Sequence, residues 1–471
     1  MISFLKSLLV QNILVKNFPA NSLSGARTRP SAPARSGVPA LLFSFSLVCG
    51  LFFAQFSLSP FSFSALHALK TSPAALSPGE RKAYETRARA LAAELRREPD
   101  NSRLHFNLGF YLYRLGKIQK AIEAYKRALR LEPNFAPAHH NLGAALLDQG
   151  KFAEARGHFQ AALRINPRMA SSHYHMGASY YREEKWEKAV SHFREAARIE
   201  PGLREAHIYL GAALFRSGRP RAAVLSYKTA LKLKGDDARV RNSLGYAYYK
   251  IGKYVESWRE FKHALKLEPK NEKALVNLGF LYEKTGNIET AITAFRDACR
   301  IGGAGAGGCE EANRLRLKYG EAVRLYNEGV TLYGLRRFDE AMKRWRSALE
   351  RAPSFSRAYY NLGVLLYQNG DEKTALRYWK KTVRINPLHV QAHYNLAAVF
   401  TRHKRYRRAT RYLKKALAVN TRHKRVLLKL GEVYEKTGKP GRALRYFRGA
   451  CNLNVIEACR RALKLKDESR G

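Results

Sequence analysis

The sequence predicts an all-α protein, a solenoid of antiparallel helix pairs with about ten repeats in two blocks. The main observation is a 34-residue period between Leu104 and Ala450, set by Leu-Gly or a near equivalent. An Ala or Ser follows each small residue twelve positions later, and a Pro closes many units. The small residues are Gly109, Gly143, Gly177, Gly211, Gly245 and Gly279 in the first block, and Gly329, Gly363, Ala397 and Gly431 in the second.

Each unit contains the residues that two packed helices require. In the first unit, Leu108 and Leu112 lie on one face of a helix. Gly109 allows a second helix to approach closely, and that helix carries Tyr125 on its buried face. Pro133 cannot continue the second helix, so it ends the unit. A single pair cannot cover its own apolar sides, so neighbouring units must stack.

This pattern closely resembles the tetratricopeptide repeat family over ten repeats, about three quarters of the chain. The resemblance implies a right-handed superhelix that binds extended peptides on the side of its first helices. No nucleophile elbow, HExxH motif or phosphate-binding loop is present. We therefore expect a binding scaffold and not an enzyme, with no cofactor and no metal.

The repeats divide the chain into six segments. We predict an export signal or membrane anchor and linker (residues 1–79), a capping helix (80–101), six repeats (102–301), a Gly-rich joint and extra helix with a cysteine pair (302–321), four repeats (322–455) and a C-terminal capping helix (456–471).

The amino-terminal segment predicts export. No acidic residue precedes Glu80, and three arginines precede a charge-free run from Ser36 to Leu69. Cleavage after Ser64 and retention of residues 40–65 as a membrane anchor are both compatible with this pattern. The basic flank favours an internal amino end, which places the repeats in the periplasm or another extracytoplasmic compartment, either free or anchored to the inner membrane. A true start codon further downstream would leave this localisation unchanged.

Four cysteines form two pairs in matching contexts. Cys299 and Cys309 follow the same sequence pattern as Cys451 and Cys459, which indicates an internal duplication. The arrangement resembles the cysteine-bridged helix pairs of Sel1-like repeats, and this resemblance implies two disulfides, consistent with export. Zinc is the alternative, but two cysteines without a histidine at ligand spacing are too few.

Two other patterns have structural explanations. Residues 303–308 satisfy GxGxxG, but they follow a helix and not a strand, so we expect a flexible joint and not a dinucleotide site. Five histidines lie four residues before the small residue of their repeats: His105, His139, His173, His207 and His393. They are expected to be packing residues, because neighbouring helices are about 10 Å apart and a metal cannot bridge them.

The family resemblance places the candidate binding residues on the side of the first helices that lines a concave groove, which we expect to be basic and rich in aromatic residues. Cations lie five residues after the Gly, with Asp148 as the exception: Arg114, Arg182, Arg216, Lys250 and Lys284. Aromatic residues accompany them, notably Tyr113, Tyr181 and Tyr249. Asparagines two before the Gly resemble the peptide-holding ladder of O-linked N-acetylglucosamine transferase: Asn107, Asn141, Asn277, Asn327, Asn361 and Asn395.

The formal net charge is +47, and this excess favours anionic partners. The candidates are an acidic protein or peptide, an anionic polysaccharide and an anionic membrane surface; compositional bias of the source is the alternative without a ligand. We predict an exported scaffold in cell-envelope or polysaccharide assembly. The alternative function is a cytoplasmic nucleic-acid-binding or general protein-interaction scaffold.

Overall fold

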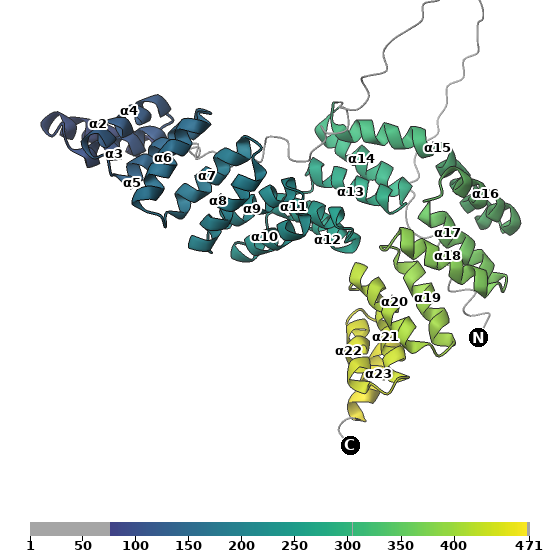
Figure 1. Cartoon of the computed structure of the whole chain (residues 1–471). Coiled ribbons are helices and arrows are strands. Elements are labelled where there is room, and N and C mark those ends of the chain that lie inside the picture. The colour runs from purple at the N-terminus through teal and green to yellow at the C-terminus, as the bar shows by residue number, and fades with distance from the viewer. Residues whose placement is uncertain (1–75, 304, 469–471) are drawn as a thin grey trace, which may run out of the picture. The chain divides into compact units, whose positions relative to one another are not determined.

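The computed structural model describes residues 76–303 and 305–468, which form 22 α-helices and no strand (Figure 1). The predicted export signal lies outside these residues. Among the described helices, none is both long and apolar enough to cross a membrane.

The repeats of the first block consist of consecutive helix pairs. Their bounds are α3 Ser102–Arg114, α4 Ile118–Leu131, α5 Ala136–Asp148, α6 Phe152–Ile165, α7 Ala170–Arg182, α8 Trp186–Ile199, α9 Arg204–Arg216, α10 Pro220–Leu233, α11 Ala238–Lys250, α12 Tyr254–Leu267, α13 Glu272–Lys284 and α14 Ile288–Gly302.

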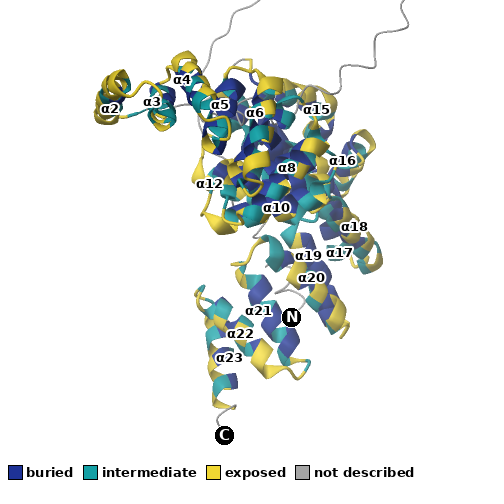
Figure 2. Ribbon diagram, turned by 60° about the vertical axis from the view of Figure 1, so that its left-hand side comes forward, coloured by how far each residue is buried: buried dark blue, intermediate teal, exposed yellow. Residues whose placement is uncertain are grey.

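The second block has four pairs and a final helix. Their bounds are α15 Gly307–Gly334, α16 Phe338–Arg351, α17 Ser356–Gln368, α18 Glu372–Ile385, α19 Val390–Arg402, α20 Tyr406–Val419, α21 Lys424–Glu435, α22 Pro440–Cys451 and α23 Ile456–Asp467. Buried and exposed faces alternate along these helices (Figure 2).

The array begins with α2, Pro78–Arg97, two residues earlier than predicted. Ser77 and Glu80 form a capping box, and Pro78 occupies the first turn, so the start of the helix is specified locally. Tyr84 packs edge-on against Tyr111 of α3 with ring centroids 5.4 Å apart. This contact covers the outer side of the first repeat.

The two helices of a repeat cross at a glycine that faces an aromatic ring. A Cβ atom on Gly143 would lie 2.7 Å from the Phe159 ring, and the equivalent glycines of eight other repeats are similarly close to a Tyr, Phe or Trp ring. The ninth repeat has Ala397 in place of the glycine and Leu413 in place of the aromatic residue. The added methyl group of the alanine is thus matched by a smaller side chain on the second helix. The glycine therefore sets the distance between the paired helices.

The turn between the paired helices contains one residue with positive φ in every repeat. Glycine supplies it in seven repeats, and the other three use Glu184, Arg336 and Lys404. The left-handed conformation is accessible to glycine at low cost, which explains the prevalence of glycine at this position. The backbone requirement is thus the same throughout the array.

The joint between the blocks differs from the prediction. The expected separate helix and the first helix of the seventh repeat are one continuous helix, α15, with Leu315, Ala322 and Leu325 buried along it. Gly308 packs against the backbone of α14, where a Cβ atom would lie 2.8 Å from the Phe295 carbonyl oxygen. Gly308 therefore forms a close contact between α14 and the start of α15.

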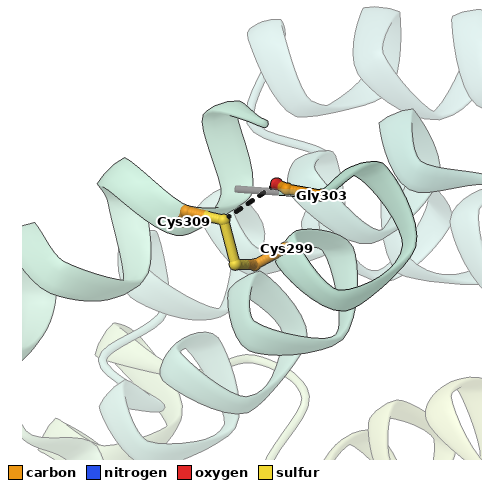
Figure 3. The surroundings of a disulfide bond; sticks show 3 residues. All are labelled: Cys299, Gly303 and Cys309. Carbon is orange, nitrogen blue, oxygen red and sulfur yellow. Dashed lines mark hydrogen bonds between the residues drawn. A yellow bond between two sulfur atoms is a disulfide. The ribbon is translucent and has the colours of Figure 1, made fainter. Parts of the chain in front are cut away.

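Both cysteine pairs lie at disulfide distance with Cα atoms 4.6 Å apart. Cys299 near the end of α14 meets Cys309 in the first turn of α15, and the Gly303 carbonyl oxygen lies 3.2 Å from Cys309 Sγ (Figure 3). Cys451 and Cys459 join α22 to α23 in the same manner. Each pair thus fixes the helix that closes its block.

One contact joins residues far apart in the chain. The Gly286 carbonyl oxygen accepts hydrogen bonds from Ser356 N, at 3.1 Å, and from Ser356 Oγ, at 2.9 Å. Arg357 also pairs with Glu289. The 34-residue period contains no signal for such a contact, because the period reports only nearest neighbours.

Gly143→Ala should lower the stability of the array by about 1 to 3 kcal/mol, because the new methyl group overlaps the Phe159 ring. Gly157→Ala is the matched control on the second helix of the same repeat, since no atom lies within 4 Å of its added Cβ. It should stabilise by roughly 0.5 to 1 kcal/mol through helix propensity. Urea unfolding measures both, and equal shifts of the two variants would contradict the role of the crossing glycine.

Candidate functional site

The predicted cations lie at the ends of first helices in consecutive repeats. We call the residues five after each Gly in the first block the cation column: Arg114, Asp148, Arg182, Arg216, Lys250 and Lys284. The first helices α5, α7, α9, α11 and α13 contact each other in sequence, so their ends share one side of the array. We call this side the first-helix face.

The cations of the column from Arg182 onwards lack an acidic partner. Among the described residues, no carboxylate lies within 4.0 Å of Arg182, Arg216, Lys250 or Lys284, although nearby arginines such as Arg204 are paired. The half-buried Arg182 has an Nε with no hydrogen-bond partner in the described part of the chain. These positive charges therefore remain available to a ligand.

Aromatic rings hold the column in place. The Arg216 guanidinium lies 5.2 Å from the Trp186 ring centroid, and Lys250 Nζ lies 5.4 Å from that of Tyr246. Tyr246 also packs against Phe215 at 5.3 Å. Stacking of this kind orients a cation without neutralising it.

The amino-terminal end of the column is different. Arg114 lies 5.8 Å from the Tyr84 ring of α2, so the terminal helix covers it. Asp148 accepts a hydrogen bond from the Tyr113 hydroxyl. The usable positive charge therefore begins at Arg182.

The equivalent positions of the second block are already satisfied in two repeats. Arg402 pairs with Glu372 and donates to the Tyr367 hydroxyl at 3.0 Å. Gln368 donates to the Tyr333 hydroxyl at 3.3 Å. The unpaired cations of the first-helix face are thus concentrated in the first block.

The predicted tyrosines mainly support the array. Tyr113 and Tyr181 are buried, so they are not available for stacking on a ligand as we had expected. Tyr249 is half-buried, and burial, with a smaller effect of Tyr254, raises its pKa to about 12. The more accessible rings are Phe110, Phe215 and Tyr246, and Phe110 is 40% exposed.

Half of the predicted asparagine ladder is buried, namely Asn277, Asn361 and Asn395. Asn277 donates to Asn242 Oδ1 at 2.9 Å, and Asn361 donates to the Tyr326 hydroxyl at 3.2 Å. Asn277 and Asn361 therefore hold neighbouring first helices together and are not free for a peptide backbone. Asn107 and Asn327 remain exposed.

Four of the five histidines have a role that the sequence analysis missed. In these four, Nε2 lies 2.9 to 3.1 Å from the carbonyl oxygen of the Pro six residues earlier, as in His139 with Pro133. A carbonyl only accepts, so Nε2 carries the proton. The signal was in the sequence, because each of these histidines follows a Pro by six positions.

A second group of histidines contains the buried His175 and the half-buried His140. His175 stacks on Phe159 at 5.7 Å and lies 5.2 Å from the His140 ring. Burial lowers the pKa of His175 to about 3 and that of His140 to about 4. Both rings are therefore neutral near pH 7. No group of three or more metal-ligating side chains occurs in the described ranges.

Comparison with known families agrees with this architecture. A family model described as the cilia and flagella-associated protein 70 C-terminal domain matches residues 62–316, and a tetratricopeptide repeat model matches residues 326–379 and 402–458. The chain belongs to the tetratricopeptide repeat family. No curated protein matches it.

Solved structures align with part of this chain, and one of them, YrrB, is described as a tetratricopeptide repeat protein. YrrB, described as having an unusual peptide-binding site, is 19% identical, with 40% of this chain and 97% of YrrB covered and a TM-score of 0.37. PilF from Pseudomonas aeruginosa is 19% identical, with 46% and 96% covered and a TM-score of 0.39. MamA from Desulfovibrio magneticus RS-1 is 25% identical, with 32% and 86% covered and a TM-score of 0.31.

The tetratricopeptide array should lose stability as the pH falls from about 6.5 towards 4. Above pH 6.5, the buried histidines are neutral in both the folded and unfolded states. Below it, the unfolded chain binds protons that the folded chain refuses, because burial lowers the histidine pKa values. Each such histidine contributes a slope of up to about 1.4 kcal/mol per pH unit.

His175→Phe keeps the ring contacts with Phe159 and removes one titrating group. Urea unfolding at several pH values should therefore give a shallower pH dependence for the variant than for the parent. An unchanged slope would show that His175 binds its proton equally well in the folded and unfolded states, which would contradict the lowered pKa.

Proposed function

We propose that this tetratricopeptide repeat protein is an exported scaffold that binds an extended acidic segment of a partner protein across the first-helix face of its first block. The cell envelope, including its polysaccharide assembly, is the proposed setting. The observation that carries the proposal is the unpaired state of Arg182, Arg216, Lys250 and Lys284 in consecutive repeats. Binding of protein partners is the common activity of this family.

The charge pattern favours contact with the ligand over a structural role. A structural arginine is expected to find a carboxylate, as Arg204 does with Asp237 at 3.1 Å. Arg182 instead has only a long contact of 3.5 Å with the Leu147 carbonyl oxygen. Charged groups that are positioned but not neutralised can bind an anion with little reorganisation.

The repeat spacing restricts the ligand. Packed neighbouring helices are about 10 Å apart, and an extended chain advances about 3.3 Å per residue. A strand laid across the first helices therefore passes one cation about every three residues. An acidic side chain at every third position matches Arg182, Arg216 and Lys250 in turn.

An acidic polysaccharide is the second candidate ligand. It is favoured by the half-buried rings of Phe215 and Tyr246 beside Lys250, since aromatic faces stack on sugars as well as on side chains. Heparin and the acidic peptide can be compared on the same protein.

Replacing Arg182, Arg216 and Lys250 together by Gln should weaken binding of an acidic peptide by more than about tenfold. Each contact to a charged group contributes on the order of 1.5 to 3 kcal/mol before screening. The control variant replaces Arg408, Arg411 and Lys414 of α20 by Gln. These three residues are exposed, and their replacement removes the same charge. Fluorescence anisotropy measures both.

The peptide itself provides a further control. A peptide with Glu at every third position should bind more tightly than one of the same composition with adjacent Glu residues. Equal losses in both protein variants, and equal affinity for both peptides, would mean that only the net charge attracts the ligand.

Export is proposed from the amino-terminal sequence and from the two cysteine pairs at disulfide distance. A reporter that is active only outside the cytoplasm should be active when fused after Gly471. The exported protein should contain no free thiol among Cys299, Cys309, Cys451 and Cys459. An inactive but stable fusion with all four thiols free would favour the cytoplasmic nucleic-acid-binding alternative.

A further inference from the structure

The second block carries a surface that the proposed peptide site does not use. Residues 373–431 contain 17 Lys and Arg and no Asp or Glu. We call the exposed cations on the second helices of this block the basic surface: Lys373, Arg377, Lys380, Lys381 and Arg384 on α18, Arg407, Arg408, Arg411, Lys414 and Lys415 on α20, and Arg442, Arg445 and Arg448 on α22.

None of these cations is neutralised within the described part of the chain. No member of the basic surface has a carboxylate within 4.0 Å, whereas the first helices of the same block retain ion pairs such as Arg402 with Glu372 and Lys429 with Glu432. Second helices of the first block such as α8, which carries Glu187 and Glu195, are mixed. In contrast, α20 and α22 carry no acidic residue, and α18 carries only Glu372, which lies in its first turn and pairs with Arg402.

The chemistry of the surface restricts the partner. Its aromatic rings lie beneath the cations, as Tyr359 does under Lys381 at 4.2 Å and Phe400 under Arg408 at 5.8 Å. The large exposed apolar side chains of the array, such as Leu317 and Leu463, lie on other helices. Without exposed rings to stack on unpaired bases or apolar groups to insert into lipid tails, the surface can act only on external anionic groups.

We propose that the basic surface binds the phosphate headgroups of an anionic phospholipid bilayer. The cations occupy three consecutive second helices, so they are distributed over an area and match a two-dimensional array of headgroups. The choice of lipid over nucleic acid rests on the proposed export, because an exported chain meets a membrane surface and not the cytoplasmic nucleic acids. The first-helix face of the first block remains free for the acidic segment.

Vesicle cosedimentation of the full chain tests this proposal. The measured quantity is the ratio of partitioning into phosphatidylglycerol-containing vesicles to partitioning into pure phosphatidylcholine vesicles, which cancels any contribution of the apolar amino-terminal segment. Replacing Arg407, Arg408, Arg411, Lys414 and Lys415 by Gln should lower this ratio at least about tenfold, since each cation near an anionic surface contributes substantially. High salt should abolish the difference.

The matched control removes the same charge from exposed positions on second helices of the first block: Arg164, Arg194, Arg221, Lys228 and Lys232. Its ratio should stay within about twofold of the parent. Equal losses in both variants would overturn the proposal, because the net charge alone would then account for the attraction. Circular dichroism and retained binding of the acidic peptide verify that each variant is folded.

A binding experiment with duplex DNA distinguishes lipid phosphates from nucleic-acid phosphates. If the protein binds duplex DNA at physiological salt and shows no preference for anionic vesicles, the lipid proposal is wrong and the surface is a nucleic-acid site. The acidic-peptide experiment depends on Arg182, Arg216 and Lys250, so failure of the lipid proposal leaves the proposed peptide site standing, and the reverse also holds.

Discussion

Close contact between a glycine of the first helix and a large side chain of the second determines the geometry of every repeat. The crossing point has room for a ring only because the glycine lacks a Cβ atom, as Gly329 with Trp345 and Gly363 with Trp379 illustrate. Trp345 also donates its indole N–H to the Tyr326 carbonyl oxygen at 3.1 Å. Since the contact recurs at one period, the ends of successive first helices face the same direction, and the cation column follows from that alignment.

Much of this architecture is predictable from the sequence because the information is local. The spacing of glycine, alanine and proline predicts the helix pairs and their stacking, and the duplicated context pairs Cys299 with Cys309. The continuous α15 was not predicted, since the sequence analysis placed a separate helix before residue 322 and began the second block of repeats there. Buried Leu315 and Leu325 hold this helix together through packing that the sequence does not display.

The candidate site was predictable in position but not in detail. Residues five after the Gly do lie at the ends of first helices, but only the structure distinguishes the unpaired Arg182 from the paired Arg402. The asparagines were misassigned for a geometric reason. Adjacent first helices are offset so that a residue meets its neighbour 35 positions away, as Asn361 meets Tyr326, and a 34-residue period does not reveal this lateral partner.

The two blocks differ in which helices carry their unpaired cations. The first block leaves cations unpaired on its first helices, whereas the second block neutralises Arg402 there, and its second helices α18, α20 and α22 carry a single acidic residue, Glu372. Self-repulsion at such a surface opposes folding. Stacking over rings such as Tyr359 and burial of Trp379 beneath it stabilise the block against this repulsion.

The continuous α15 has a mechanical consequence. In a repeat array, each unit is stabilised by its neighbours, so an irregular junction is the natural place for the array to open. Here the same helix is tied to α14 through Cys299 and Cys309 at one end and forms the first helix of the seventh repeat at the other. Opening at the junction would require breaking the helix itself. We therefore expect amide hydrogen exchange in the middle of the array to follow cooperative unfolding of the helix that links the two blocks.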